Sequence, residues 1–253
     1  MTEPLEPAPS PRVVVLIATI PARRNSCERL LNELSKQSRP PDGVVLVLDG
    51  YGTLAAPASP LPVFIEARTD ALTGAGSRWR AALDLPAEDI VICLDDDIML
   101  LEAHRLVQKL VEAVEKGGGA AAVMGRASDG KAAPPGRFSR GNLIYAAGCG
   151  LTVRAKHLVA LQEFSAEVQS KGGPNALGLL GDDDALVSAF LWKSGVPILH
   201  AAAGNIYAAP GMRTTSQTAA RAKESPDAQK VAIKKATGWP WPVVKEAISA
   251  RRA

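Results

Sequence analysis

Three consecutive carboxylates end an apolar segment in the stretch VICLDDDIML, Val91–Leu100. They are Asp95, Asp96 and Asp97, and side chains of like charge this close together favour protonation or a bound cation. One interpretation is structural, because acidic side chains cap the free N–H groups at a helix N-terminus and face the positive end of its dipole. The other is a site for a divalent cation.

A second acidic cluster has the same form. Asp182, Asp183 and Asp184 begin a helix-like run, GDDDALVSAFLWK, and helix capping explains this cluster equally well on its own. Two triple-aspartate clusters among 26 acidic residues are nevertheless an unusual concentration. Because the chain has three histidines and no closely spaced cysteines, the clusters suit Mg²⁺ or Mn²⁺ better than a softer metal.

The segments around these clusters predict a parallel α/β sheet covered by helices on both faces. Nearly continuous apolar runs alternate with segments whose apolar residues recur at helical spacing. We expect strands at 13–18, 44–48, 62–66, 90–94, 120–124, 142–153 and 196–200. We expect helices at 27–37, 74–83, from the first acidic cluster to about 116, 155–164 and 182–193.

Polar side chains follow three of these predicted strands. Thr19 follows the first, Asp49 the second and Asp95–Asp97 the fourth. Ligands of open parallel sheets bind outside the carboxyl ends of the strands, so we expect these side chains to lie at one edge. Their convergence favours a binding site.

Length and charge indicate one domain with a basic extension. The 253 residues, 47% of them hydrophobic, can build one sizeable core. We predict a disordered lead at 1–11, a domain at 12–210 with halves at 12–97 and 98–210, and a basic helical extension at 211–253. The extension holds 9 Lys and Arg against 3 Asp and Glu, whereas the rest of the chain holds 20 against 23. Such a tail suits an anionic substrate, peripheral contact with a membrane, or a solvated helix.

Composition also bounds the compartment and the partners. The longest apolar run is too short to span a bilayer, and the N-terminus lacks the features of a signal peptide. Cys27, Cys93 and Cys149 are widely spaced, which predicts reduced and buried thiols. We therefore expect a cytoplasmic protein, peripheral at most on the inner membrane face. Aromatic residues make up 4% of the chain, so no nucleic-acid partner is expected.

Six motifs in order resemble the inverting glycosyltransferases of the GT-A fold, closest to glycosyltransferase family 2. They span about 12–207 and read VVVLIATIPARR, VVLVLDG, GAGSRWRAALDL, VICLDDDI, GCGLTVRAKHLVAL and GDDDALV. The resemblance implies a single GT-A domain, Rossmann-like and typical of nucleotide-diphospho-sugar transferases, with a mostly parallel central sheet flanked by helices. It also implies Mn²⁺- or Mg²⁺-dependent transfer of a sugar with inversion. The donor would be a nucleotide-diphosphate sugar, with a UDP-sugar favoured, and the acceptor would be a hydroxyl of a saccharide or another molecule.

The resemblance also implies which residues contact the nucleotide. Ala18, Thr19 and Pro21 lie on the first strand and on the loop that faces the nucleotide in that family. Asp49 ends the second strand and is expected to contact the nucleoside. Arg78 follows the glycines of the third motif and is expected to approach the base.

The metal and the leaving group are expected at the DxD motif. Asp97 is implied as the metal ligand, and Asp95 as a second ligand or a contact of the ribose or a metal-bound water. Asp96 is implied beside the donor. Arg213 lies in a late loop that closes over the donor in family members, where it would clamp the diphosphate; an ordinary exposed arginine is the alternative.

The last motif implies the catalytic base. Asp183 takes that position, and Asp182 replaces the glutamate that precedes it in the family. Two departures matter, because Ala185 stands where the family has aspartate and no histidine stands at the late metal-binding position. His200 lies nearer and is a candidate ligand, although a structural histidine within a strand is the favoured interpretation.

Two other functions stay open at this stage. A sugar-1-phosphate nucleotidyltransferase shares the sheet and the metal requirement, but would need a glycine-rich phosphate loop. ATIPARRNS has the arginines of such a loop and no glycine. A non-catalytic, glycosyltransferase-like binding module would explain both departures from the family motifs.

Overall fold

A ten-stranded sheet forms the centre of the described part of the chain. The computed structural model describes residues 10–68, 74–100, 103–117, 119–127, 132–133, 142–146, 149–177, 182–204, 206–208 and 226–241. The strand order in this sheet is β3-β2-β1-β4-β10-β6-β11-β9-β7-β8. Their bounds are β1 Val13–Thr19, β2 Gly43–Leu48, β3 Val63–Arg68, β4 Ile90–Leu94, β6 Ala120–Ala122, β7 Gly125–Ala127, β8 Ala132–Ala133, β9 Asn142–Ala146, β10 Cys149–Arg154 and β11 Ile198–His200. A separate pair joins β5 (Ile98–Met99) to β12 (Tyr207–Ala208).

Most of the large sheet runs in one direction. β1 pairs in parallel with β2 and β4, β2 with β3, and β6 with β11. β10 lies between β4 and β6 and is antiparallel to both, so β6 again points the same way as β4. β9 and β8 are the other reversed strands of this sheet. The predicted fold class, a Rossmann-like α/β domain with a mostly parallel sheet, is confirmed.

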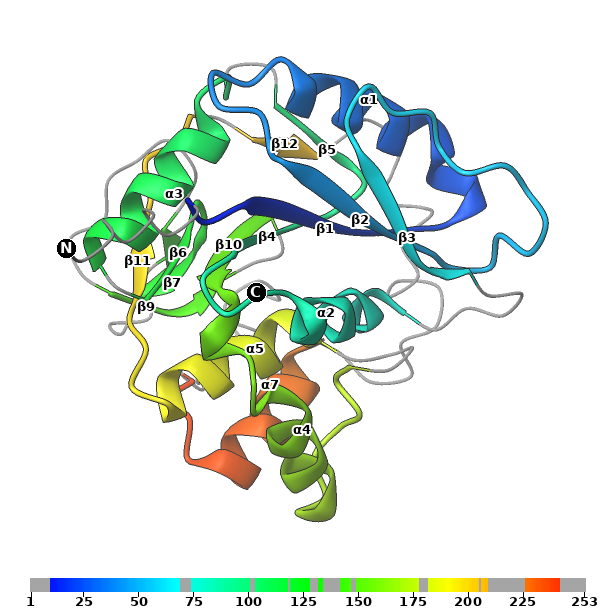
Figure 1. Ribbon diagram of the computed structural model, residues 1–253. Coiled ribbons are helices and arrows are strands. Elements are labelled where there is room, and N and C mark those ends of the chain that lie inside the picture. The colour runs from blue at the N-terminus through cyan, green and yellow to red at the C-terminus, as the bar shows by residue number, and fades with distance from the viewer. Residues whose placement is uncertain are drawn as a thin grey trace, which may run out of the picture.

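Helices cover both faces of the sheet (Figure 1). One layer holds α1 (Arg24–Ser35) and α3 (Leu106–Gly117), and the other holds α2 (Arg78–Ala81), α4 (Leu161–Ser170), α5 (Asp183–Lys193) and α7 (Pro226–Thr237). Short 3₁₀ turns lie at Pro21–Arg23, Ala75–Ser77, Ala82–Asp84 and Ala155–His157.

The position of β1 between two layers of helices explains why its sequence is continuously apolar. Val13, Val15 and Ile17 pack into the cluster beneath α1 and α3, whereas Val14 and Leu16 pack into the cluster on the opposite face. Successive side chains of a strand point to opposite faces, so a strand covered on both sides needs apolar residues throughout.

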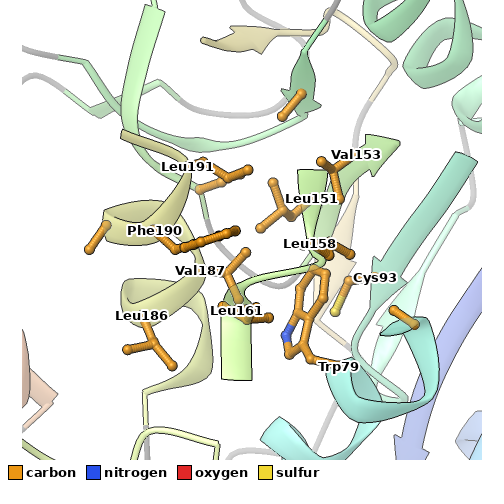
Figure 2. Packing of buried hydrophobic residues seen from close by; sticks show 14 of the residues in the cluster. Trp79, Cys93, Leu151, Val153, Leu158, Leu161, Leu186, Val187, Phe190 and Leu191 are labelled. Carbon is orange, nitrogen blue, oxygen red and sulfur yellow. The ribbon is translucent and has the colours of Figure 1, made fainter. Parts of the chain in front are cut away.

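The hydrophobic cluster on the face opposite α1 and α3 holds α5 against the sheet. Figure 2 shows Val187, Phe190 and Leu191 of α5 directed toward Leu151 and Val153 of β10. All are buried. Burial of side chains of this size contributes about 1.5–3 kcal/mol each, so α5 is held firmly against the sheet.

Several predicted bounds differ from the structure. The strand predicted at 142–153 is two strands, β9 and β10, which are not neighbours in the sheet. The helix predicted to begin at the first acidic cluster begins instead at Leu106, after a turn and β5. The predicted helix at 155–164 is a 3₁₀ turn followed by α4. β7 and β8 lie in a segment expected to be a loop.

Some predictions concern residues outside the described ranges. These are residues 1–9 of the lead predicted at 1–11, Arg213, and residues 211–225 and 242–253 of the basic extension. Within the described part of the extension, Pro226–Thr237 forms α7. No helix in the described ranges has the length and hydropathy needed to cross a bilayer.

Candidate active site

The polar residues predicted to converge do lie at one edge of the sheet. β2, β1 and β4 are adjacent and parallel, and their carboxyl ends carry Asp49, Thr19 and Asp95–Asp97. The three aspartates form a turn between β4 and β5. Among the described residues they begin no helix, since β5 follows them and α3 begins only at Leu106, so the capping interpretation is not supported for this cluster.

Asp96 and Asp97 share one arginine. Arg23 Nη1 donates to Asp96 Oδ1 at 2.8 Å, and Arg23 Nη2 lies 3.2 Å from Asp97 Oδ2. The Asp96 side chain is 4% exposed and that of Asp97 is 23% exposed. Burial raises the pKa of Asp96 to about 6, and the charge of Arg23 opposes this rise. Asp96 is therefore the enclosed acid of the pair, and Asp97 the accessible one.

Asp95 and Asp183 share a second, fully buried arginine. Arg78 Nη1 donates to Asp95 Oδ1 at 2.9 Å and to the Leu94 carbonyl at 3.0 Å. Arg78 Nη2 donates to Asp183 Oδ2 at 3.1 Å. The guanidinium thus joins the two triple-aspartate clusters, which are far apart in the sequence. Arg78 was predicted to approach the nucleotide base; in the structure its described contacts are with carboxylates and backbone.

Asp183 has a second donor in Trp79. The indole Nε1 donates to the same oxygen, Asp183 Oδ2, at 2.9 Å. Trp79 is fully buried, so its position is set by the core. Two fixed donors on one oxygen orient the carboxylate.

Asp184 lies beside the Arg78–Asp183 ion pair. Its Oδ1 is 4.0 Å from Arg78 Nη2. Burial, and then the charges of Asp183 and Asp95, raise the pKa of Asp184 well above its usual range. Asp184 therefore holds a proton more readily than an ordinary aspartate.

Asp182 makes the contacts of a helix cap. Its Oδ1 accepts from the Ala185 amide at 2.9 Å, and its Oδ2 lies 3.2 Å from Lys230 Nζ on α7. Lys230 Nζ also lies 5.0 Å from the centroid of the Tyr145 ring and 5.2 Å from that of Trp241. The predicted catalytic role of Asp182 stays a prediction beside this capping geometry.

The two tryptophans of the tail pack inside the protein. Trp239 is fully buried and donates from Nε1 to the Ile144 carbonyl at 2.9 Å, and it stacks on Trp241. These are the contacts of side chains packed in the core. They attach the segment that follows α7 to β9.

Asp49 ends β2 in a buried position. Its Oδ2 accepts from the Gly74 amide at 2.9 Å, and Gly74 has a φ of 93°, in the region that favours glycine. Asp49 therefore fixes the start of the glycine-led segment that carries Arg78. Ala18 is half-buried near the end of β1, and Pro21 begins the next turn.

His200 is not brought together with the acids. It lies on β11, and β10 and β6 separate this strand from β4. Its Nε2 is 2.9 Å from the Val123 carbonyl oxygen, and the side chain is buried. These contacts are those of a structural histidine.

The described carboxylates can serve a divalent ion only in part. Within the described ranges, no group of three or more His, Cys, Asp or Glu side chains is placed to hold a metal. Asp95 and Asp97 offer at most two carboxylates. This donor set fits Mg²⁺ or Mn²⁺ in the manner of nucleotide-dependent enzymes, where substrate phosphates and water complete the coordination.

Two residues of the site carried no predicted role. Arg23 and Trp79 contact the acidic residues directly. The arginines of ATIPARRNS were a signal for the first, since they follow the first strand. No local pattern pointed to Trp79, whose contact with Asp183 joins residues more than one hundred positions apart.

Comparisons with known proteins rest on structure. No protein-family model matches the sequence, and no curated protein matches it either. The structure of GalNAc-T7 with UDP, GalNAc and Mn²⁺ is similar with a TM-score of 0.52 and 12% identity, over 79% of this chain and 44% of that one. The mannosyltransferase PcManGT from Pyrobaculum calidifontis, with GDP-Man and Mn²⁺, is similar with a TM-score of 0.51 and 16% identity, over 93% of this chain and 73% of that one.

These similarities define the class of fold. Both proteins have the GT-A fold, and so does this chain. The chain spans less than half the length of GalNAc-T7. The resemblance to a GT-A protein inferred from the six motifs is therefore confirmed for the fold.

Proposed function

We propose that the protein is a metal-dependent glycosyltransferase that transfers a sugar from a nucleotide-diphosphate sugar to an acceptor hydroxyl with inversion. The observation that carries the proposal is the pair of acidic clusters joined through Arg78 at the carboxyl edge of a GT-A sheet. One cluster suits the leaving diphosphate and the other the acceptor. The two similar solved structures, one with UDP and Mn²⁺ and one with GDP-Man and Mn²⁺, support this class of donor.

The first cluster serves the donor. Asp97 and Asp95 would hold the metal ion, and Asp49 would accept a hydrogen bond from the nucleoside. The ion supplies positive charge to the departing diphosphate. Thr19, Ala18 and Pro21 line the same edge, and Arg213 would contact the diphosphate from the late loop.

The second cluster serves the acceptor. Asp183 would accept the proton of the attacking hydroxyl as the general base. Its Oδ2 is held by Trp79 and Arg78. The Oδ1 atom is then the oxygen to which we assign the proton transfer. Attack from the face opposite the diphosphate inverts the anomeric centre.

The other functions have less support. A sugar-1-phosphate nucleotidyltransferase would use a glycine-rich loop after β1, where this chain has the turn Pro21–Arg23. A non-catalytic module would need no oriented carboxylate, whereas Asp183 has two buried donors. Peripheral membrane contact through the tail stays a prediction, since Lys230 and Lys234 of α7 have partners within the protein.

Nucleotide binding tests the proposal. We expect UDP or GDP with Mn²⁺ to raise the melting temperature of the wild type by roughly 5–10 °C at about one hundred times Kd. Asp97→Ala should abolish the Mn²⁺-dependent part of the shift and leave the fold intact. Asp84→Ala, at an exposed aspartate outside the site, is the matched control. The absence of any nucleotide- and Mn²⁺-dependent shift in the wild type would refute the proposed function.

A further inference from the structure

Arg23 is held in the site by a buried carboxylate. It ends the turn after β1, and its side chain is 13% exposed. Nη1 contacts Asp96, whose side chain is almost fully buried and whose backbone carbonyl accepts from Ser26 Oγ. Both partners of this ion pair are largely buried. If the guanidinium moved away, the Asp96 carboxylate would remain as an unpaired charge in an apolar environment.

The other half of the guanidinium contacts an accessible carboxylate. Nη2 lies 3.2 Å from Asp97 Oδ2, the oxygen of the residue proposed to hold the metal ion. Rotation of Asp97 toward a cation would remove this acceptor from Nη2 and would leave Nη1 paired with Asp96. In addition, Arg23 Nε is buried and has no hydrogen-bond partner among the described residues.

The site has more carboxylates than guanidinium groups, and this excess favours a cation beside the carboxylates. The guanidinium groups of Arg23 and Arg78 face a larger number of carboxylates. These carboxylates belong to Asp95, Asp96, Asp97, Asp183 and Asp184. Arg78 is fully buried and both of its Nη atoms donate to carboxylates, so only its buried Nε has no partner among the described residues. Arg23 is partly exposed and lies beside the accessible Asp97, and its planar guanidinium can donate to phosphate oxygens.

We propose that Arg23 binds the diphosphate of the donor, with Asp96 as its permanent anchor and Asp97 as the partner that it releases to the metal ion. The inference rests on the proposed function and adds a residue to it. A purely structural role, in which Arg23 only neutralises Asp96, is the competing explanation.

A double variant separates the two explanations. Arg23→Gln with Asp96→Asn removes both members of the buried pair, so that no uncompensated charge remains. Binding is measured by calorimetry with Mn²⁺ and either UDP or GDP, whichever the wild type binds more tightly, and with the corresponding nucleoside. We expect the diphosphate to bind roughly 10- to 100-fold more weakly, the loss of a charge-assisted hydrogen bond. The nucleoside should bind as it does to the wild type.

A second measurement follows the release of Asp97. Mn²⁺ alone should bind the double variant at least as tightly as the wild type, because Asp97 has lost a competing partner. Weaker Mn²⁺ binding would overturn the exchange. Arg24→Gln is the matched control, since Arg24 is the next residue but its Nε donates to Glu28 at 3.0 Å.

The outcomes distinguish this inference from the proposed function. Wild-type diphosphate affinity in the double variant would overturn the role of Arg23 and leave the proposed function standing. No diphosphate binding by the wild type would refute both. Should the double variant not fold, Arg23→Lys keeps a charge beside Asp96 but lacks the fork, and an unchanged diphosphate affinity there would equally overturn the inference.

Discussion

Arg78 and Asp183 form a buried ion pair, with Nη2 and Oδ2 3.1 Å apart. The same guanidinium contacts Asp95 Oδ1 at 2.9 Å. One side chain thus fixes the distance between the acids that end β4 and the acids that begin α5. In the proposed reaction, this distance separates the leaving diphosphate from the base that receives the acceptor proton.

Removal of Arg78 should destabilise the protein strongly. Arg78→Met leaves Asp95 and Asp183 without their shared cation, and breaking a buried pair costs about 3–5 kcal/mol. The free energy of unfolding, measured in urea, should fall by this amount. Addition of Asp183→Asn to this variant should recover part of the loss, because one uncompensated charge is removed. Arg80→Met, at an exposed arginine two residues on, should change stability by less than about 0.5 kcal/mol.

Asp49 should be needed for nucleotide affinity. Asp49→Ala removes the acceptor proposed for the nucleoside and the bond to the Gly74 amide, and we expect about tenfold weaker binding of UDP or GDP. The dependence of binding on Mn²⁺ should remain. Asp49→Asn can still accept from Gly74, so it separates the anchoring of that segment from contact with the nucleotide. Unchanged affinity in Asp49→Ala would remove Asp49 from the binding site.

Much of this site followed from the apolar runs and the residues that end them. β1, β2 and β4 are short, continuously apolar and parallel, so Thr19, Asp49 and the first acidic cluster had to share an edge. The pairing within the site did not follow from sequence. Arg78 joins Leu94, Asp95 and Asp183 through contacts that only the folded chain creates.

The predicted helix after the first acidic cluster was wrong for a related reason. Ile98, Met99 and Leu100 read as the beginning of an apolar helix face, yet β5 pairs there with β12, more than one hundred residues later. A pairing partner so distant leaves no trace in local periodicity. The reversed strand β10, which enters the sheet between β4 and β6, was missed as a separate strand on the same grounds.

Cys27 should make stability depend on alkaline pH. Burial, with the charge of Asp96 as a smaller cause, raises the pKa of the Cys27 thiol to about 12. The thiol ionises near pH 8.5 in the unfolded chain, so this contribution to stability is complete below that pH and is lost as pH rises toward 12. The free energy of unfolding should therefore fall by up to about 1.4 kcal/mol per pH unit from this group. In Cys27→Ala the slope between pH 9 and 10.5 should be smaller by that amount; an identical slope would contradict the assignment.

Asp183→Asn should separate binding from transfer. Asparagine keeps the size of the side chain and an oxygen for the donors on Trp79 and Arg78, but it cannot take a proton at neutral pH. The variant should bind donor and Mn²⁺ nearly as the wild type does and lose roughly 10²–10⁴ in transfer rate, the usual contribution of a positioned base. Donor calorimetry and a transfer assay on the same preparation measure both quantities, with Asp84→Asn as the control at an exposed position. Asp182→Asn preserves helix capping and loses the charge paired with Lys230, so a loss of this size there, with full transfer in Asp183→Asn, would move the base to Asp182.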